Sequence, residues 1–431
     1  MLLWFTLGNY RSFKDKATLS LQATSSDELE DTNVYHSDGL RILKTAAIYG
    51  PNGGGKSNFL RGLCFMAKFV KESSLNTQIG TPINVEPFLL SQDTENEPSY
   101  FEAAFKTDKA TYQYGFEADS KEVKKEWLYQ TGTGKPARLF YREGMEIQSG
   151  RKFGAGKQIE KMVRNNSLFL SVASQLNVEV SKDILEWFGK IMDFTEIPHH
   201  AYQNFSASLY DRSVIGEGLK EDLKTLGFIF EQLSVEIIPP DSPLPIEGMR
   251  ETLLEIGKGK LYKLILHHAK RDNKGKIIGT TGFDFSKMES MGTQKVVAFL
   301  PFIHLLTKSF LLNVADEFEA NMHPLLARAL LMLINQSTVT NGGQLIFATH
   351  DTNLLAPGLL RRDQVWLTPK NQREESYLVS LVEYKVKKEN NMEKGYLEGR
   401  YGAIPYIGKM ETKVITPSNA KKTRNTAKKK S

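Results

Sequence analysis

The feature that most constrains this chain is a glycine-rich octapeptide, GPNGGGKS, at residues 50–57. It fits the pattern Gly-x4-Gly-Lys-[Ser/Thr], whose glycines let successive backbone N–H groups converge on phosphate oxygens at a helix N-terminus. An apolar run at 45–49 precedes the loop. A helical pattern follows it, with one apolar face made of Leu60, Leu63, Ala67 and Val70. The order of strand, glycine loop and helix predicts a nucleotide-binding site.

Each position of the loop has an expected role with ATP and Mg²⁺, the predicted cofactors. Lys56 would reach the β- and γ-phosphates and act in catalysis, and the Ser57 hydroxyl would be a ligand of Mg²⁺. Among the other Gly-Lys pairs, those at 134–135, 156–157 and 259–260 lack this hydroxyl, and we interpret them as turns. The residues expected to contact the nucleotide from this loop are Gly50, Asn52, Gly53, Gly54, Gly55, Lys56, Ser57 and Asn58.

Two later strands are expected to bring acid and imidazole groups to the same site. The run 310–315 delivers Asp316, a predicted Mg²⁺ ligand, and Glu317, which would orient or deprotonate the attacking water. The run 344–348 leads to His350, which would donate to a γ-phosphate oxygen. Taken singly, the acid pair also fits a solvated turn, and the histidine a strand end bonded to backbone.

A Ser-x-Gly turn begins an amphipathic helical pattern near residue 290. Ser290 reads locally as an N-cap. Together with Gly292 and Thr293 it also forms a second phosphate-seeking helix start, which we expect to contact the nucleotide of another subunit.

The fold expected is α/β, with a mixed sheet flanked by helices and a helical insertion. The predicted divisions are an N-terminal lobe at 1–155, which holds the glycine loop and a strand-rich subdomain, a helical insertion at 156–250 and a C-terminal lobe at 251–412. A basic tail is expected at 413–431. The proline-rich stretch 239–245 reads as a linker or long loop.

The charge distribution, the cysteine content and the hydropathy of the chain indicate what kind of protein it is. The net charge is +6, but residues 412–431 carry seven bases and no acid, which leaves −1 for the rest. The tail is interpreted as disordered, with electrostatic contact to nucleic acid as the alternative. The single cysteine, Cys64, fits a reducing cytoplasm, and no membrane span or export signal is expected.

The ordered motifs GPNGGGKS, ESMGT, NVADE and FATH resemble those of the ATP-binding heads of the ABC, SMC and RecF class. The segment NYRSFK resembles their first strand, which implies that Arg11 or Phe13 lies near the nucleotide. More narrowly, DEFEANMHPLL, ATHDTNLL and GYLEGRYGAIPYIG are similar to RloA-type ATPases, a group of bacterial abortive-infection proteins that includes the ATPase component of AbiL-like systems.

This resemblance implies a homodimer or larger oligomer that acts as a sensor or scaffold in phage defence. It also implies a separate nuclease-like effector encoded nearby and a phage-derived trigger. The segment 156–250 would sense or dock a partner. The motif ESMGT lacks the leading Leu and second Gly of transporters, Gln92 is a candidate Q-loop residue, and the pair His323-Pro324 suggests either a dimer contact or a helix start.

Two rival functions follow from the same motifs. A RecF- or SMC-like DNA-maintenance ATPase would need a basic stripe, whereas the chain before the tail sums to −1. A structural protein that binds ATP without hydrolysis is disfavoured by the intact Glu317.

Overall fold

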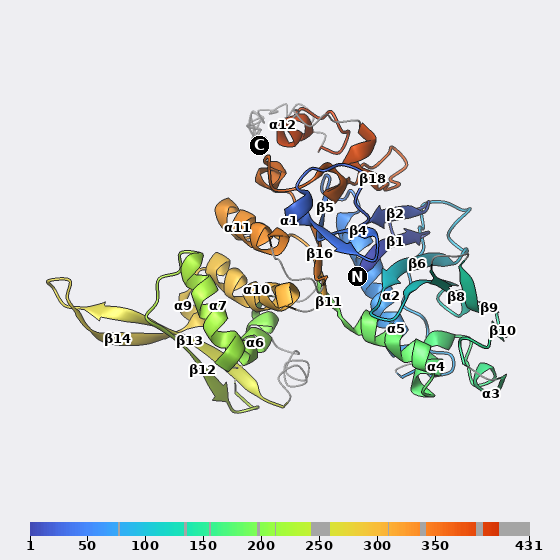
Figure 1. Cartoon of the computed structure of the whole chain (residues 1–431), viewed down its shortest axis with the longest axis horizontal. Helices are drawn as coiled ribbons and strands as arrows, with labels where there is room; N and C mark the ends of the chain where they lie inside the picture. The colour runs from blue at the N-terminus through green and yellow to red at the C-terminus, as the bar shows by residue number, and fades with distance from the viewer. Residues whose placement is uncertain are drawn as a thin grey trace, which may run out of the picture.

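The computed structural model of the protein describes residues 1–75, 78–132, 136–154, 157–195, 199–211, 213–242, 259–308, 310–336, 342–384 and 391–404. The expected tail at 413–431 and the end of the proline-rich stretch lie outside these residues. The larger of two main sheets is antiparallel, with strand order β10-β9-β8-β7-β6-β1-β2 (Figure 1). Its strands are β1 (Leu2–Gly8), β2 (Ala17–Ser20), β6 (Ser99–Lys106), β7 (Thr111–Ala118), β8 (Val123–Thr131), β9 (Ala137–Glu143) and β10 (Glu146–Ser149).

The second main sheet has the order β11-β15-β16-β5-β17-β18 and is parallel except at β18. Its strands are β5 (Thr45–Tyr49), β11 (Ile191–Phe194), β15 (Leu312–Ala315), β16 (Gln344–Ala348), β17 (Val365–Leu367) and β18 (Val379–Ser380). Every residue of β5 and β16 is buried, as expected for a parallel sheet covered on both faces.

Alternate residues of this second sheet pack into two different cores. Ala46 and Ile48 belong to a core shared with the antiparallel sheet, whereas Ala47 and Tyr49 belong to a core on the opposite face. Helix α2 (Lys56–Glu72) lies in the first core and contacts both β1 and β16, with Leu60, Leu63, Ala67 and Val70 buried as the sequence predicts. The result is a helix layer between two sheets (Figure 1).

The remaining helices cover these cores from outside. On the side of the first core lie α3 (Lys157–Glu160), α4 (Phe169–Gln175) and α5 (Glu179–Gly189). On the side of the second lie α6 (His199–Tyr210), α7 (Ser213–Thr225), α9 (Phe285–Met288), α10 (Met291–Lys308), α11 (Pro324–Asn335) and α12 (Met392–Leu397). The short elements are α1 (Glu30–Asn33), η1 (Thr352–Leu355), η2 (Arg362–Gln364) and η3 (Leu381–Tyr384). The predicted α/β class, a mixed sheet flanked by helices, is confirmed.

Two small sheets complete the fold. The strands β3 (Val34–Ser37) and β4 (Leu40–Leu43) form a hairpin. The strands β12 (Gln232–Ile238), β13 (Leu261–Arg271) and β14 (Ile277–Asp284) form an antiparallel sheet, and β13 and β14 project beyond the helices beside them (Figure 1).

The segment 156–250 is less purely helical than the sequence suggests. Besides helices it contains β11, an edge strand of the parallel sheet, and β12. Both strands are short or half-exposed, so their apolar residues are too few to stand out against the helical periodicity around them.

An amide side chain joins the two main sheets. Gln344, the first residue of β16, is fully buried; its Oε1 accepts from the Leu2 N–H at 2.6 Å, and its Nε2 donates to the Leu2 and Leu43 carbonyls at 3.0 and 3.1 Å. Two hydrogen bonds from this buried residue therefore hold β1 against the parallel sheet, and the third holds the end of β4.

A buried ion pair holds α4 against the antiparallel sheet. Glu126 and Arg142 are both fully buried and lie 3.5 Å apart. Glu126 accepts the backbone N–H groups of Phe169 and Leu170 at 2.7 and 3.0 Å, and Arg142 donates to the Ser167 carbonyl at 2.6 Å. Burial raises the pKa of Glu126, and the Arg142 charge opposes that rise.

Candidate nucleotide-binding site

Three neighbouring parallel strands end at one edge of the second sheet. β16 pairs with β5 on one side, where Ala348 lies opposite Ile48, and with β15 on the other, where Phe347 lies opposite Ala315. The glycine loop, Asp316 and His350 each follow one of these strands by one or two residues. The carboxyl ends of parallel strands therefore bring all three together, where α/β sheets bind their ligands.

The backbone of the loop admits only glycine at several positions. Gly53 and Gly55 have φ values of 73° and 105°, in the left-handed region that side chains disfavour. A Cβ on Gly55 would lie 2.5 Å from the Ser376 Oγ, and one on Gly54 would lie 2.7 Å from the Thr368 carbonyl oxygen. The chain after β17 thus closes one side of the loop, a contact that the sequence did not reveal.

Lys56 is buried at the centre of this edge. Its Nζ donates to the Gly50 and Pro51 carbonyls at 3.0 and 3.1 Å. Burial lowers the pKa of Lys56, and the charges of Asp316, Glu319 and Glu317 oppose that decrease. The lysine is therefore within electrostatic reach of the acids after β15, as the predicted site requires.

The acid pair has an unusual backbone. Asp316 is half-buried, and its Oδ1 accepts the Glu317 N–H at 3.1 Å. Glu317 is exposed and has a φ of 46°, a left-handed conformation that costs a non-glycine residue on the order of 1–3 kcal/mol. Such strain persists only where the surrounding structure holds the residue in place.

A third acid, Glu319, belongs to the same cluster and was missed by the sequence analysis. Its Oε1 accepts the backbone N–H of His350 at 2.8 Å, while its Oε2 is buried without a hydrogen-bond partner. Partial burial and the Lys56 charge lower the pKa of His350, against the opposing effect of the acids. The imidazole is therefore neutral at pH 7. The spacing Glu317-x-Glu319 was the available signal.

The donor set fits Mg²⁺ bound with a triphosphate. Ser57 lies in the first turn of α2 beside Lys56, and Asp316 acts electrostatically on Lys56. Within the part of the chain that the structure describes, the Ser57 hydroxyl makes no hydrogen bond, so it is available as a ligand. Mg²⁺ is commonly held by one or two protein oxygens, with phosphates and waters completing the shell.

The Ser-x-Gly turn caps its helix as predicted. Ser290 Oγ accepts the Thr293 N–H at 3.2 Å and lies 2.9 Å from the Thr293 hydroxyl. Gly292 packs against the segment after the acid pair, since a Cβ there would lie 2.3 Å from the Asn321 carbonyl oxygen. Ser290 itself is exposed. Its hydrogen bonds lie within its own turn, which leaves the outer face of the turn open.

One turn further along α10, Lys295 connects this helix to the acid pair. Lys295 is 1% exposed, and its Nζ donates to the Glu317 carbonyl at 2.6 Å. Burial lowers the pKa of Lys295 to about 8, against the opposing charges of Glu319, Glu317 and Asp316. The sequence analysis assigned no role to Lys295, which follows the polar residues Thr293 and Gln294.

The N-terminal turn reaches the glycine loop through Ser12 rather than through Arg11. The Ser12 Oγ accepts from the Asn58 Nδ2 at 2.9 Å, and the Ser12 carbonyl accepts the Ser376 N–H at 2.8 Å. The Arg11 guanidinium instead donates to Glu86 at 3.2 Å. Phe13, the other residue proposed from the resemblance, is fully buried in the core beneath α2.

Two further predicted residues lie in ordered loops. Gln92 is exposed in a loop that Asn9 holds through hydrogen bonds to the carbonyls of residues 94, 97 and 98. His323 caps α11, because its Nδ1 accepts the Leu325 N–H at 3.3 Å and Pro324 is the first helical residue. The helix-start interpretation of His323-Pro324 is therefore confirmed, while its dimer contact stays a prediction.

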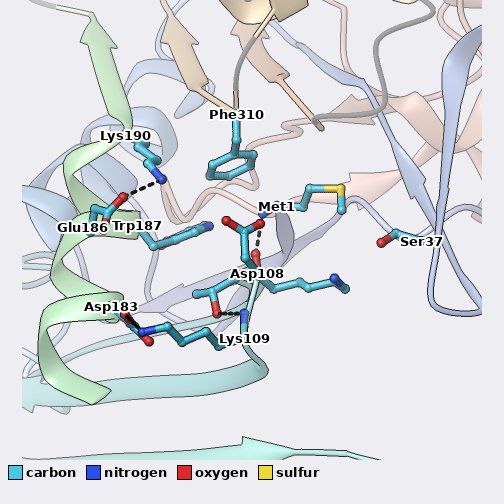
Figure 2. Close-up of a pocket in the computed structure, with 11 residues that line it drawn as sticks. Met1, Ser37, Asp108, Lys109, Asp183, Glu186, Trp187, Lys190 and Phe310 are labelled. Atoms are coloured by element: carbon cyan, nitrogen blue, oxygen red, sulfur yellow. Dashed lines mark hydrogen bonds and ion pairs between the residues drawn. The ribbon is translucent and has the colours of Figure 1, made fainter. Parts of the chain in front are cut away.

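A separate cavity of about 540 Å³ lies at the start of β1 and the ends of β6 and α5 (Figure 2). Its charges are largely matched: Lys109 pairs with Asp183 at 2.6 Å, and Lys190 pairs with Glu186 at 2.9 Å. None of the predicted phosphate-binding residues lines it. It is therefore distinct from the edge that holds Lys56.

Comparison with known families agrees with this geometry. Residues 46–356, more than two thirds of the chain, match the family described as "AAA domain, putative AbiEii toxin, Type IV TA system". The chain belongs to this AAA family. It is thus a P-loop ATPase of the AAA type, and the predicted ABC- or SMC-like P-loop class is supported at that level.

Two solved structures are similar to this AAA protein. The SMC head domain from Thermotoga maritima is 14% identical with a TM-score of 0.40, over 88% of this chain and 98% of that chain. An SMC head bound to the C-winged helix domain of ScpA is 13% identical with a TM-score of 0.39, over 91% and 99%. A comparison with curated protein sequences gives no match. Among the described residues, no helix has the length and apolar content needed to cross a membrane.

Proposed function

We propose that this AAA protein binds and hydrolyses Mg-ATP as a homodimer. The observation that supports the proposal most directly is the meeting of Lys56, the acids after β15 and His350 at one edge of a parallel sheet. A buried cation and an exposed carboxylate are groups that commonly bind the phosphates and position the attacking water in phosphoryl transfer, and an imidazole beside them can donate to a phosphate oxygen.

Each group has a distinct part in this reaction. The glycine loop and Lys56 would hold the phosphates, with Ser57 and Asp316 as the ligands of Mg²⁺. Bound Mg²⁺ would supply charge neutralisation for the β- and γ-phosphates. Glu317 would orient the attacking water and accept its proton, and His350, neutral at pH 7, would donate a hydrogen bond to the γ-phosphate.

A second copy of the chain would complete the site with its own Ser290 turn. Three large apolar side chains at or just before the starts of α10 and α11, two helices in contact, are more than half exposed: Met288 at 62%, Met291 at 59% and Leu325 at 69%. We call them the signature patch. Exposed apolar side chains around a helix start suit an interface that forms when ATP is bound between two copies.

Hydrolysis is tested with three single variants of the full chain. Lys56→Ala should lose measurable ATP binding, whereas Glu317→Gln should bind ATP and lose at least about a hundredfold in kcat, the usual contribution of a general base. Lys260→Ala is the matched control, because Lys260 also follows a glycine but is exposed and distant in sequence from the site. Unchanged turnover in the Lys56 or Glu317 variant would refute the proposal.

Dimer formation is tested by adding charge to the signature patch. Met291→Asp should prevent ATP-dependent association of the Glu317→Gln protein in analytical ultracentrifugation. Met145→Asp is the matched control, since Met145 is 57% exposed in the turn between β9 and β10. Equal association of both variants would exclude this face as the interface.

For the biological role, we propose an abortive-infection type of phage defence in which the ATPase controls a separate effector of nuclease type. The family description supports this role, because it names a type IV toxin–antitoxin system. The resemblance to RloA- and AbiL-type proteins is part of the same proposal, as are a phage-derived trigger and a cytoplasmic location. The segment 156–250, chiefly α6 and α7, is the proposed place for sensing or partner docking.

The role is tested by expressing the chain with the product of the neighbouring gene and challenging the cells with phage. Protection that disappears in the Glu317→Gln variant, together with co-purification of the two proteins, is the expected result. Full protection by the neighbouring protein alone would contradict it.

A further inference from the structure

The hairpin of β13 and β14 is exposed on all sides over its outer half. From Lys270 to Gly282, every residue is exposed except Asp272, which is half-buried. At its base the hairpin packs on α6 and α9, and its outer end projects past the helices (Figure 1). Residues 270–282 of this ribbon belong to neither core, so they are available for contact with another molecule.

The end of the hairpin is strongly basic. Residues 270–276 carry Lys270, Arg271, Lys274 and Lys276 against one acid, Asp272. The Asp272 carboxylate accepts the backbone N–H groups of Lys274 and Lys276, both at 2.9 Å, so it forms the turn instead of pairing with a lysine. Within the described residues, none of the three lysines takes part in an ion pair.

This concentration of charge contrasts with the rest of the chain. The residues before the tail sum to −1, and lysines near the base of the hairpin are paired, as Lys263 is with Asp284 at 3.4 Å. Four bases on an exposed turn repel one another unless a polyanion binds them. The arrangement therefore indicates an anionic partner.

We propose that the β13–β14 hairpin is an arm that binds the phosphate backbone of duplex DNA. The major groove of B-form DNA admits a two-stranded ribbon, and lysines along the ribbon would then reach phosphates on both sides. Beside the basic turn, Ile277 and Ile278 offer no hydrogen bond to base edges, so the proposal assigns the affinity to phosphate contacts, and only Asn273 and Thr280 could add a preference for particular bases. The inference stands apart from the proposed ATPase function, since no residue of the sheet edge takes part.

The test is a salt titration of binding to a short labelled DNA duplex by the full chain. The variant Lys270→Ser/Lys274→Ser/Lys276→Ser removes three charges. The control Arg151→Ser/Lys152→Ser/Lys161→Ser removes three exposed charges from the other side of the molecule. A second pair of proteins repeats the comparison with the seven bases of residues 413–430 changed to Ser, which removes the contribution of the tail. Thermal melting verifies that every variant is folded.

Removing three lysine–phosphate contacts should reduce the steepness of the negative slope of log K against log salt by about 2.7. The affinity advantage of the natural chain over the hairpin variant would then shrink about fortyfold between 50 and 200 mM salt. The control variant should keep the natural slope. A duplex of RNA, whose deep major groove excludes such a ribbon, should bind more weakly than DNA.

Three results would overturn the proposal. The first is an equal loss of slope in the hairpin and control variants, which would mean a general effect of charge. The second is natural DNA binding by the folded hairpin variant. The third is a hairpin variant whose self-association changes while DNA binding does not, which would show that the exposed edge of β14 pairs with protein.

Discussion

The side-chain nitrogen of Lys295 donates a hydrogen bond to the backbone carbonyl of Glu317 across 2.6 Å. Glu317 has a left-handed φ of 46° where a strand residue would have an extended backbone. The hydrogen bond from Lys295 holds the Glu317 carbonyl in this conformation. The helix that begins with the Ser290 turn is therefore fastened to the residue proposed as general base.

Lys295→Met should lower kcat for ATP hydrolysis by about tenfold to a hundredfold while KM for ATP changes little. A hydrogen bond from a charged group contributes about 1.5–3 kcal/mol, and here that energy positions Glu317. Lys295→Arg should recover part of the rate, since it keeps a donor. Steady-state kinetics measure both, and a Met variant with natural kcat would show that the bond has no part in turnover.

The same lysine predicts a pH dependence of stability. Its pKa in the folded chain is about 8, below the ordinary 10.5, because of burial. Below pH 8 both folded and unfolded chains carry the proton, and burying that charge costs folding energy. Between about pH 8 and 10.5 the unfolded chain binds more protons, so stability rises with pH.

Urea unfolding of the natural chain and of Lys295→Met, from pH 7 to 10, measures this effect as a difference in which other groups cancel. The free energy of unfolding of the natural chain minus that of the variant should increase by up to roughly 3 kcal/mol between pH 7 and pH 10. A difference that stays constant across this range would contradict the lowered pKa.

The glycine loop predicts a pair of unequal substitutions. Gly53→Ala should lower the free energy of unfolding by about 1–2 kcal/mol, the cost of a left-handed φ for alanine. No steric clash adds to this cost, because nothing lies within 4 Å of a Cβ added at Gly53. Gly55→Ala adds a clash with Ser376 and should cost a further 1–3 kcal/mol or so. Adding Ser376→Gly should recover that second part only. Equal stability losses for the two alanine variants in urea would refute the steric argument.

The buried pair in the antiparallel sheet gives a prediction about stability alone. Glu126→Ala leaves Arg142 charged and unpaired in the core and should lower the free energy of unfolding by about 3–5 kcal/mol. The matched control is Glu117→Ala, which removes the Glu117–Lys125 pair at 3.3 Å near the surface and should cost less than about 1 kcal/mol. Denaturant titration measures the free energy of unfolding of both variants. Similar losses of stability would show that burial does not increase the contribution of the Glu126–Arg142 pair.

The sequence predicted the strands and motifs with strong local signals. The runs 45–49 and 344–348 are strands at the predicted bounds, because each is a short apolar stretch bounded by polar or glycine residues. It also predicted that Asp316 and His350 would follow neighbouring strands. The contacts that hold the site could not be predicted, because Ser376 and Lys295 reach it only through tertiary packing and carry no local pattern.

The surroundings of Arg11 also depend on tertiary packing that the sequence does not show. The resemblance implies that Arg11 or Phe13 lies near the nucleotide, which stays a prediction; in the structure the Arg11 guanidinium pairs with Glu86, a residue 75 positions away in the sequence. The sequence does not show which of the adjacent side chains Arg11 and Ser12 contacts the glycine loop. That contact depends on the backbone of the turn, in which Arg11 has a left-handed φ of 50°.

The buried amide of Gln344 has a consequence for motion. Sliding one main sheet over the other would break both of its hydrogen bonds to Leu2 and leave part of a buried carboxamide without partners. The two sheets are therefore expected to move together, and a displacement of α10 on nucleotide binding would act on the acid pair through the hydrogen bond from Lys295 to Glu317.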